Sequence, residues 1–171
     1  IASAAEVGAV DDPADDTEPA TIDSWLGRYA NEYGVDARQA AAILNRESKG
    51  DAKAVSPAGA KGLMQLMPDT FEEVKKELGL PADADIFDPE TNIRAGVYYF
   101  SKMMKQFKGD VNKALAAYNW GPGNVSTAVR QYGDNWFEGA RTKGIKVKVK
   151  GKEVIRKLPK ETLNYVSALE S

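Results

Sequence analysis

Residues 47–68 read ESKGDAKAVSPAGAKGLMQLMP, one carboxylate followed by a glycine-punctuated loop that carries methionines and a glutamine. The carboxylate belongs to Glu47, in the last turn of a predicted helix. Asp36 is a residue type that caps the start of a helix, and Gly50 is a residue type that often follows its end. The sequence therefore predicts a helix that places Glu47 at the edge of an irregular loop, where functional residues are often found.

The predicted helix gives Glu47 an unusual position for a charged group. Leu44, Ile43 and Ala40 precede it by three, four and seven residues, so the carboxylate shares the apolar face of the helix. Partial burial and the negative end of the helix dipole both disfavour the ionised form. A carboxylic acid that stays protonated near neutral pH can act as a general acid. The alternative is a surface glutamate paired with a neighbouring basic residue.

Four separated segments of the chain carry a family resemblance. In chain order they are Glu47-Ser48, the loop with Ser56 and Gly62-Leu63-Met64-Gln65-Leu66-Met67-Pro68-Asp69-Thr70, the pentapeptide Ala117-Tyr118-Asn119-Trp120-Gly121, and Pro159-Lys160-Glu161-Thr162-Leu163-Asn164-Tyr165-Val166. Together they resemble the catalytic domain of the soluble lytic transglycosylases, over about residues 22–169.

This resemblance implies a lysozyme-like, predominantly α fold of the α+β lysozyme-like superfamily, a helical bundle with a small β region. It implies an enzyme, a peptidoglycan lytic transglycosylase that cleaves the β-1,4 bond between N-acetylmuramic acid and N-acetylglucosamine. In such enzymes one Glu protonates the glycosidic oxygen and then acts as base while the C6 hydroxyl of the muramic acid closes on C1. The product is a 1,6-anhydro sugar, and no metal or organic cofactor is expected.

Two alternatives share this fold. A goose-type muramidase would use the same acid but hydrolyse the bond with water, and a non-catalytic peptidoglycan-binding module would keep the fold alone. A complete set of site residues argues against the non-catalytic module. Asp69, Glu72 and Glu73 are interpreted as structural, because an acid in the first turn of a helix stabilises its dipole.

The resemblance assigns roles to the loop after Glu47. It implies that the hydroxyl of Ser56 hydrogen-bonds the catalytic Glu, that Gly62 lets the backbone approach the sugar, and that Met67 forms an apolar wall. Gln65 can donate and accept hydrogen bonds to a sugar. Thr70 closes the same motif and is assigned a supporting role.

The later motifs supply three further candidates. Tyr118 is expected to position the catalytic Glu and the intermediate, with Asn119 in the same cluster. Tyr165 is expected to hold the Glu from the other side. By itself each tyrosine is also compatible with plain core packing. Trp120 replaces a residue that is more often small in the family, so it is a candidate for stacking on a sugar.

Composition narrows the possible chemistry. The chain has 171 residues, no Cys and no His, which excludes disulfides, thiolate metal sites, His-based triads and zinc sites of the usual kind. Among the possible enzyme classes, one whose catalytic group is a carboxylate remains. The expected partners are peptidoglycan glycan strands; no nucleic-acid partner and no transmembrane segment are expected, and we expect a monomer.

The predicted organisation is an acidic flexible leader over residues 1–20 and a single lysozyme-like domain over residues 21–171. No intact signal peptide is visible in this chain, and no apolar run is long enough to cross a bilayer. We expect localisation in the cell envelope, in the periplasm, or secretion.

Helical patterns run through most of the chain from Ile22 onward. Further helices are predicted to begin at Pro68, at Pro89 with its end near Gly109, at Asp110 with its end at Gly121, and at Pro159. Within the helix that begins at Pro89, Asn92 and Gly96 are interpreted as helix-packing residues.

A basic hairpin insertion is predicted over about residues 141–157, because Val and Ile alternate with Lys on both sides of Gly151. Lys146, Lys148 and Lys150 are interpreted as its solvated face. The alternative hypothesis is that they border the glycan groove and attract anionic stem peptides or wall polymers.

Overall fold

The structure is a computed structural model that describes residues 20–170, with side chains through Val166. The described residues are mostly helical, with one two-stranded antiparallel sheet, which confirms the predicted fold class. The predicted acidic leader lies outside them, apart from Ala20. The chain divides into two compact units between Tyr98 and Tyr99, and each is described by itself as unit 1 and unit 2.

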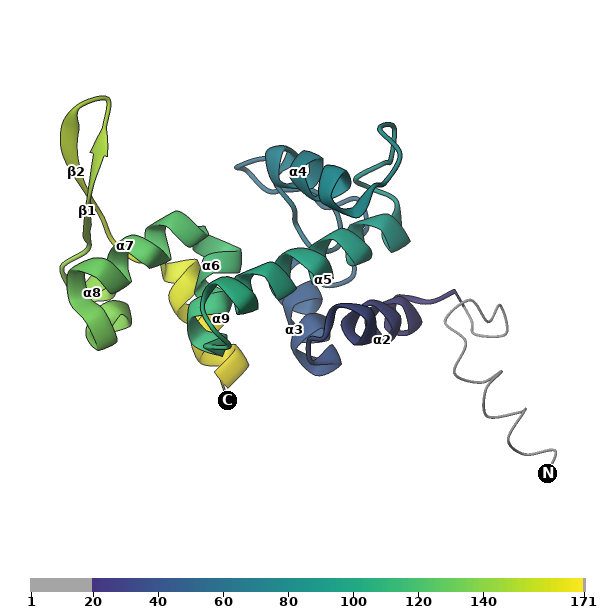
Figure 1. Cartoon of the computed structure of the whole chain (residues 1–171), viewed down its shortest axis with the longest axis horizontal. Coiled ribbons are helices and arrows are strands. Elements are labelled where there is room, and N and C mark those ends of the chain that lie inside the picture. Colours follow the sequence, from purple (N-terminus) through teal and green to yellow (C-terminus); the bar gives the residue numbers. More distant parts are fainter. Residues whose placement is uncertain (1–19, 171) are drawn as a thin grey trace. The chain divides into compact units, whose positions relative to one another are not determined.

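From residue 20 onward, where the structure describes the chain, unit 1 contains three complete helices and the first part of a fourth (Figure 1). They are α2 (Ile22–Tyr33), α3 (Ala37–Ser48), α4 (Pro68–Leu78) and α5 (Pro89–Gln106). Among the described residues, none of the helices combines the length and the apolar character needed to cross a bilayer. The predicted helix starts at Pro68 and Pro89 are confirmed.

The caps of α3 fix the place of its last turn. The carboxylate of Asp36 accepts a hydrogen bond from the backbone N–H of Arg38 at 2.7 Å, as predicted for an N-cap. The predicted end is confirmed, because Gly50 (φ 83°) directly follows the C-cap residue of the helix. That residue is Lys49, which takes the left-handed conformation (φ 54°) after Ser48. Its N–H donates to the carbonyl of Asn45, which satisfies one of the last helical carbonyls.

Hydrogen bonds between polar side chains join α2 to α5 within unit 1. The hydroxyl of Tyr29 donates to Oε2 of Glu90 at 2.5 Å, and Nε of Arg94 donates to the hydroxyl of Tyr33 at 2.8 Å. Burial, followed by the hydrogen bond to Glu90, raises the pKa of Tyr29 to about 12. These contacts hold the first turns of α5 against α2, and α5 carries residues that support the loop before α4.

Unit 2 contains the remainder of α5 and the elements that follow it. They are α6 (Val111–Trp120), α7 (Pro122–Tyr132), the short 3-10 helix η1 (Gly133–Asn135), α8 (Trp136–Thr142), the strands β1 (Ile145–Val149) and β2 (Lys152–Arg156), and α9 (Lys160–Glu170). The predicted bounds of α6 are confirmed, since Asp110 caps its start and Gly121 follows its end. Gly121 also precedes Pro122 in the first position of α7, a start that the sequence analysis did not single out.

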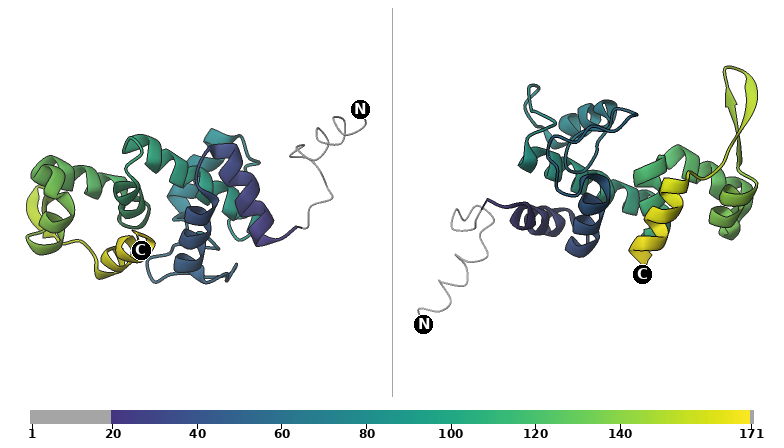
Figure 2. Two further views of the ribbon diagram at one scale, coloured as in Figure 1. Left: turned by 90° about the horizontal axis from the view of Figure 1, so that it is seen from below. Right: turned by 180° about the vertical axis from the view of Figure 1, so that it is seen from behind.

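The predicted hairpin is present. β1 and β2 pair antiparallel with Val147 opposite Val154 and Val149 opposite Lys152, and Lys150-Gly151 connects them. Both connecting residues have positive φ, 51° and 79°, as a two-residue type I′ turn requires. Within unit 2, the turn end of the hairpin projects away from α7 and α8 (Figures 1 and 2).

Candidate active site

Glu47 lies where the sequence placed it, in the last turn of α3. Ala40, Ile43 and Leu44 on the same helix are buried, and Glu47 itself is half-buried. The prediction that the carboxylate lies beside the apolar face is therefore confirmed. Such a site lets the acid reach solvent or a ligand while part of its surroundings remains apolar.

The loop between α3 and α4 is ordered by its own backbone. Lys61 forms isolated bridges with Val55 and with Leu66. The N–H of Ser56 donates to the carbonyl of Ala60 at 2.9 Å, and the hydroxyl oxygen of Ser56 accepts from the N–H of Ala60 at 3.0 Å. Because the hydroxyl group acts as an acceptor here, its own proton can still be donated. The predicted hydrogen bond from Ser56 to Glu47 stays a prediction.

Gln65 braces the loop from within. Its backbone has a positive φ of 52°, and its Nε2 donates to the carbonyl oxygens of Ala54 at 3.0 Å and of Gly62 at 2.9 Å. Both amide hydrogens are therefore used inside the loop. Its carbonyl oxygen Oε1 is the atom that can accept a hydrogen bond from a sugar, so only the acceptor half of the predicted role fits this geometry.

Gly62 and Asn92 are packed against each other. Gly62 has a φ of 82°, and a Cβ atom there would lie 2.2 Å from Nδ2 of Asn92 and 3.0 Å from the carbonyl oxygen of Ile86. The structure thus gives this glycine a packing reason, besides the predicted approach of a sugar, which remains a prediction.

Asn92 supports the loop more directly than its sequence pattern indicates. From α5, its Oδ1 accepts from the N–H of Met64 at 2.7 Å, while Nδ2 donates to the carbonyls of Lys61 (3.1 Å) and Ile86 (2.7 Å). The side chain is fully buried. It was interpreted as a helix-packing residue, but it fixes the loop backbone. The available signal was a polar amide beside the apolar stripe of a long helix.

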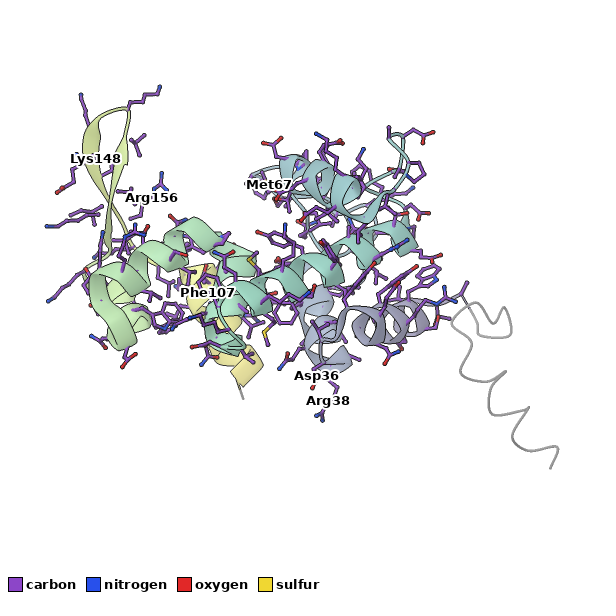
Figure 3. All side chains as sticks on the ribbon, viewed as in Figure 1. Asp36, Arg38, Met67, Phe107, Lys148 and Arg156 are labelled. Atoms are coloured by element: carbon purple, nitrogen blue, oxygen red, sulfur yellow. The ribbon has the colours of Figure 1, made fainter. Side chains whose placement is uncertain are left out.

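The next glycine on α5 serves the same loop. A Cβ at Gly96 would lie 2.4 Å from Cβ of Met64, so only glycine lets the methionine lie on the helix. Met64 and Leu66 are buried, whereas Gln65 is half-buried and Met67 is 43% exposed. The predicted alternation is confirmed, although the segment turns and is not extended. Met67 is labelled at the start of α4 in Figure 3.

The other candidates on α4 lie close to its start. Thr70 is half-buried in the first turn. Asp69, Glu72 and Glu73 are exposed, and Oε1 of Glu72 forms an ion pair with Nζ of Lys75 at 2.8 Å. This pairing agrees with a structural interpretation of Glu72. Within residues 20–170, no cluster of three or more acidic side chains could hold a metal ion.

A separate depression lies between the start of α2 and the end of α3. Leu26, Leu44, Asn45 and Lys49 are among the residues that line it, and Glu47 is not. Because Glu47 does not line this depression, we do not assign the depression to the candidate active site. The loop residues that support the candidate site follow the C-terminal end of α3 in the sequence.

Tyr118 and Asn119 lie in the last turns of α6, in unit 2. The ring of Tyr118 is almost fully buried, with ring centroids 5.5 Å from Tyr99 and 6.4 Å from Phe100. Oδ1 of Asn119 accepts from Oγ1 of Thr162 at 2.5 Å, and its Nδ2 donates to Oε1 of Glu161 at 3.2 Å. Asn119 therefore ties α6 to the first turn of α9.

Tyr165, also in unit 2, is fully buried on α9, the helix that packs against α6. Unit 2 thus brings Tyr118, Asn119 and Tyr165 onto two neighbouring helices, and unit 1 gathers Glu47 and the loop candidates. Trp120, at the end of α6, is half-buried, and its carbonyl accepts from Nδ2 of Asn124 at 2.8 Å.

The mostly helical fold of the described residues, with one small two-stranded sheet, is that of lysozyme-like structures. The chain belongs to the transglycosylase SLT domain family, whose model matches residues 24–138. The predicted family resemblance is therefore confirmed.

Individual proteins of this family are similar over most of the chain. The soluble lytic murein transglycosylase of Escherichia coli (strain K12) is 35% identical over 123 residues, which cover 70% of this chain and 19% of that protein. An inactive mutant of lytic transglycosylase Slt from Pseudomonas aeruginosa superposes with a TM-score of 0.70 at 30% identity, covering 98% of this chain and 25% of that one.

A third relative is a solved complex. The 70-kDa soluble lytic transglycosylase with bulgecin A has a TM-score of 0.71 at 28% identity, over 88% of this chain and 23% of that chain. The chain therefore spans a quarter or less of the length of these three relatives.

Proposed function

We propose that this chain is the catalytic domain of a peptidoglycan lytic transglycosylase, an enzyme that cleaves the MurNAc-GlcNAc β-1,4 bond and leaves 1,6-anhydro-MurNAc ends. The observation that carries the proposal is Glu47, a half-buried acid in the last turn of α3, followed by a loop held by Asn92. Relatives named as murein transglycosylases support it. So does the inactive Slt mutant, in which a glutamate is replaced by glutamine.

In the proposed reaction the carboxyl group of Glu47 donates its proton to the glycosidic oxygen. The bond from that oxygen to C1 of the muramic acid breaks, and the departing GlcNAc keeps the proton on its hydroxyl group. The carboxylate then removes the proton of the C6 hydroxyl while that oxygen bonds to C1. The substrate's N-acetyl group stabilises the cationic centre between the two steps. One carboxylate serves twice, unlike the two-carboxylate glycosidases.

Loop residues of unit 1 are proposed to orient the acid and the sugar. Ser56 can donate its hydroxyl proton toward the acid, and Oε1 of Gln65 can accept from a sugar hydroxyl. The exposed side chain of Met67 offers an apolar contact, and Thr70 supports the motif from α4. Each role predicts that substituting the residue lowers the activity even though Glu47 is still present.

Tyr118, Asn119 and Tyr165 are proposed as supporting residues on the strength of the family motif. The partner that we propose is the glycan strand of peptidoglycan, bound by a monomer in the cell envelope. We further propose that residues 21–171 form the transglycosylase domain and that residues 1–20 are a leader to it.

The test is mass spectrometry of the muropeptides released from purified peptidoglycan by the wild-type chain, by Glu47→Gln and by Asp69→Asn. Asp69, exposed on α4, is a matched carboxylate control. We expect products lighter by one water than hydrolysed ends from the wild type and from Asp69→Asn, and none from Glu47→Gln. Loss of a general acid lowers rates by about 10²-fold or more.

Other outcomes would change the assignment. Reducing ends would make the protein a muramidase that uses water. Binding to peptidoglycan without release of products by any of the three proteins would make it a binding module. Circular dichroism of the wild type and of Glu47→Gln checks that the variant is folded.

A further inference from the structure

The hairpin formed by β1 and β2 concentrates positive charge in a chain whose net charge is −2. Residues 143–157 contain seven basic side chains and one acidic side chain, Glu153. The basic residues, all of them exposed, are Lys143, Lys146, Lys148, Lys150, Lys152, Arg156 and Lys157. The remaining sequence is net negative, so an anionic partner is attracted to this hairpin in preference to the rest of the chain.

The hairpin also exposes apolar side chains. Residues opposite each other in an antiparallel pair lie on one face, so Val147, Val149 and Val154 share a face of the sheet. Val149 is 37% exposed and Val154 is 39% exposed, and Ile155 on the other face is 58% exposed. A role for the lysines alone would not require apolar residues at Val149, Val154 and Ile155, because threonine, which strands also favour, would suit a solvent-exposed strand equally well.

The base of the hairpin is fixed. Nε2 of Gln131 on α7 donates to the carbonyl of Lys146 at 2.8 Å, and its Oε1 accepts from the N–H of Lys146 at 3.0 Å. The hydroxyl of Tyr132 donates to the carbonyl of Gly144 at 2.5 Å, and Ile145 is buried. The amide of Gln131 thereby pairs with β1 as a neighbouring strand would.

The far end carries the exposed residues on a tight turn. Figure 3 shows Lys148 on the projecting part of the hairpin and Arg156 nearer the helices of unit 2. A strand of five residues extends about 16 Å at about 3.3 Å per residue. The hairpin is therefore a short arm, held at one end, with Val149 and Lys152 on one face and Lys148 on the other face near its free end.

We propose that this arm binds the surface of an anionic phospholipid bilayer. The lysines would meet the headgroups, while Val149 and Val154 would enter the boundary between headgroups and acyl chains, which amphipathic segments enter by about 5–10 Å. Lysine side chains suit this place, because their apolar stems can lie in the boundary while their charges stay in water.

Two other occupants fit less well. A soluble polyanion, such as an anionic wall polymer, would use the lysines but leave the valines exposed to water. A second copy of the chain would have to pair strand edges that both carry several lysines, an arrangement that opposes edge-to-edge pairing. The bilayer is the partner that uses both features of the hairpin.

The experiment is co-sedimentation with vesicles of phosphatidylglycerol mixed with phosphatidylcholine, and with vesicles of phosphatidylcholine alone. Four proteins are compared: the wild type; Lys146→Gln/Lys148→Gln/Lys150→Gln; Val149→Thr/Val154→Thr; and a control with Lys53→Gln/Lys76→Gln/Lys105→Gln. The control removes three exposed lysines outside the hairpin. Threonine keeps the branched shape that strands favour, and circular dichroism confirms folding of each variant.

We expect the wild type and the control to bind the anionic vesicles alone. Removing three hairpin lysines should weaken binding on the order of 100-fold, from about fivefold for each lysine. The valine variant should bind about three- to tenfold more weakly, because less apolar surface is buried.

Absence of binding to anionic vesicles by the wild type would overturn the proposal. Full binding by the valine variant, together with equal binding of the wild type to soluble polyphosphate, would identify a polyanion site instead. A Glu47→Gln variant should bind vesicles as the wild type does, so the result is independent of the proposed transglycosylase activity.

Discussion

The loop before α4 and the β1–β2 hairpin are both non-helical segments between helices, but they are held in different ways. In the loop, the buried amide of Asn92 and the side chain of Gln65 bond backbone groups along its length. In the hairpin, Gln131 and Tyr132 hold Lys146 and Gly144 at the base, and residues 148–153 around the turn are exposed. Support distributed along a segment suits side chains that must be positioned for a reaction, and support at one end suits side chains presented to a surface.

The largest expected effect comes from comparing glycines with the same backbone conformation. Gly62, Gly50 and Gly151 have φ values of 82°, 83° and 79°, but only at Gly62 would a Cβ meet another atom within 4 Å. We expect Gly62→Ala to lower the free energy of unfolding by about 4 kcal/mol, and the other two alanine variants by about 1 kcal/mol each, the cost of the left-handed conformation alone. Urea unfolding measures all three.

The additional loss in the free energy of unfolding at Gly62, compared with Gly50 and Gly151, should depend on the side chain of Asn92. In the double variant Gly62→Ala/Asn92→Ala the clash with the amide is absent and only the 3.0 Å approach to the carbonyl oxygen of Ile86 remains, so the two losses should not add. Equal losses in the free energy of unfolding at Gly62 and Gly151 would show that the loop accommodates a methyl group as easily as the hairpin does. The proposed difference in support between the two segments would then be wrong.

A smaller effect is expected for Asn92→Ala. This change leaves the N–H of Met64 and the carbonyls of Lys61 and Ile86 without their partner, at about 1 kcal/mol each, or about 3 kcal/mol in total. Chemical unfolding and muropeptide release should both show the loss, because the loop after Glu47 loses its support.

Asn92→Asp gives a sharper measurement at the same position. An ionised carboxylate keeps the acceptor for Met64 but cannot donate to the two carbonyls. We expect this variant to be destabilised at pH 7 and partly restored on acidification, since a protonated carboxyl group regains one donor. A variant whose stability does not depend on pH would contradict the hydrogen-bonding role of Nδ2.

The smallest effect is expected at the base of the hairpin. Gln131→Ala removes two hydrogen bonds to Lys146, but the groups are exposed and water replaces the amide. We expect a loss of about 1 kcal/mol or less and unchanged muropeptide release. Gln106→Ala, at the exposed end of α5, is the control. A loss as large as that of Asn92→Ala would mean that the hairpin is as firmly integrated as the loop.

Features that depend on neighbouring residues in the chain could be predicted from the sequence. The cap at Asp36 and the helical spacing placed Glu47, the prolines marked the starts of helices, and the alternation of Val with Lys marked the hairpin. Each of these signals acts over a few residues, so it can be read without knowledge of the fold.

Contacts between distant residues could not be predicted in this way. Asn92 bonds Met64 across 28 positions, and Gln131 bonds Lys146 across 15. Neither residue has a local pattern that names its partner. At Gly121-Pro122 the sequence indicates the end of one helix but not the start of α7, because one glycine serves both.

The turn at Lys150-Gly151 has a practical consequence for labelling. The chain contains no cysteine, and a Cβ at Gly151 would meet no other atom within 4 Å. Glu153 is exposed and lies two residues after Gly151. A thiol introduced there, by Glu153→Cys, would be a unique and accessible attachment point for a fluorophore or a spin label. Such a probe would report on the surroundings of the hairpin tip while leaving the residues around Glu47 chemically untouched.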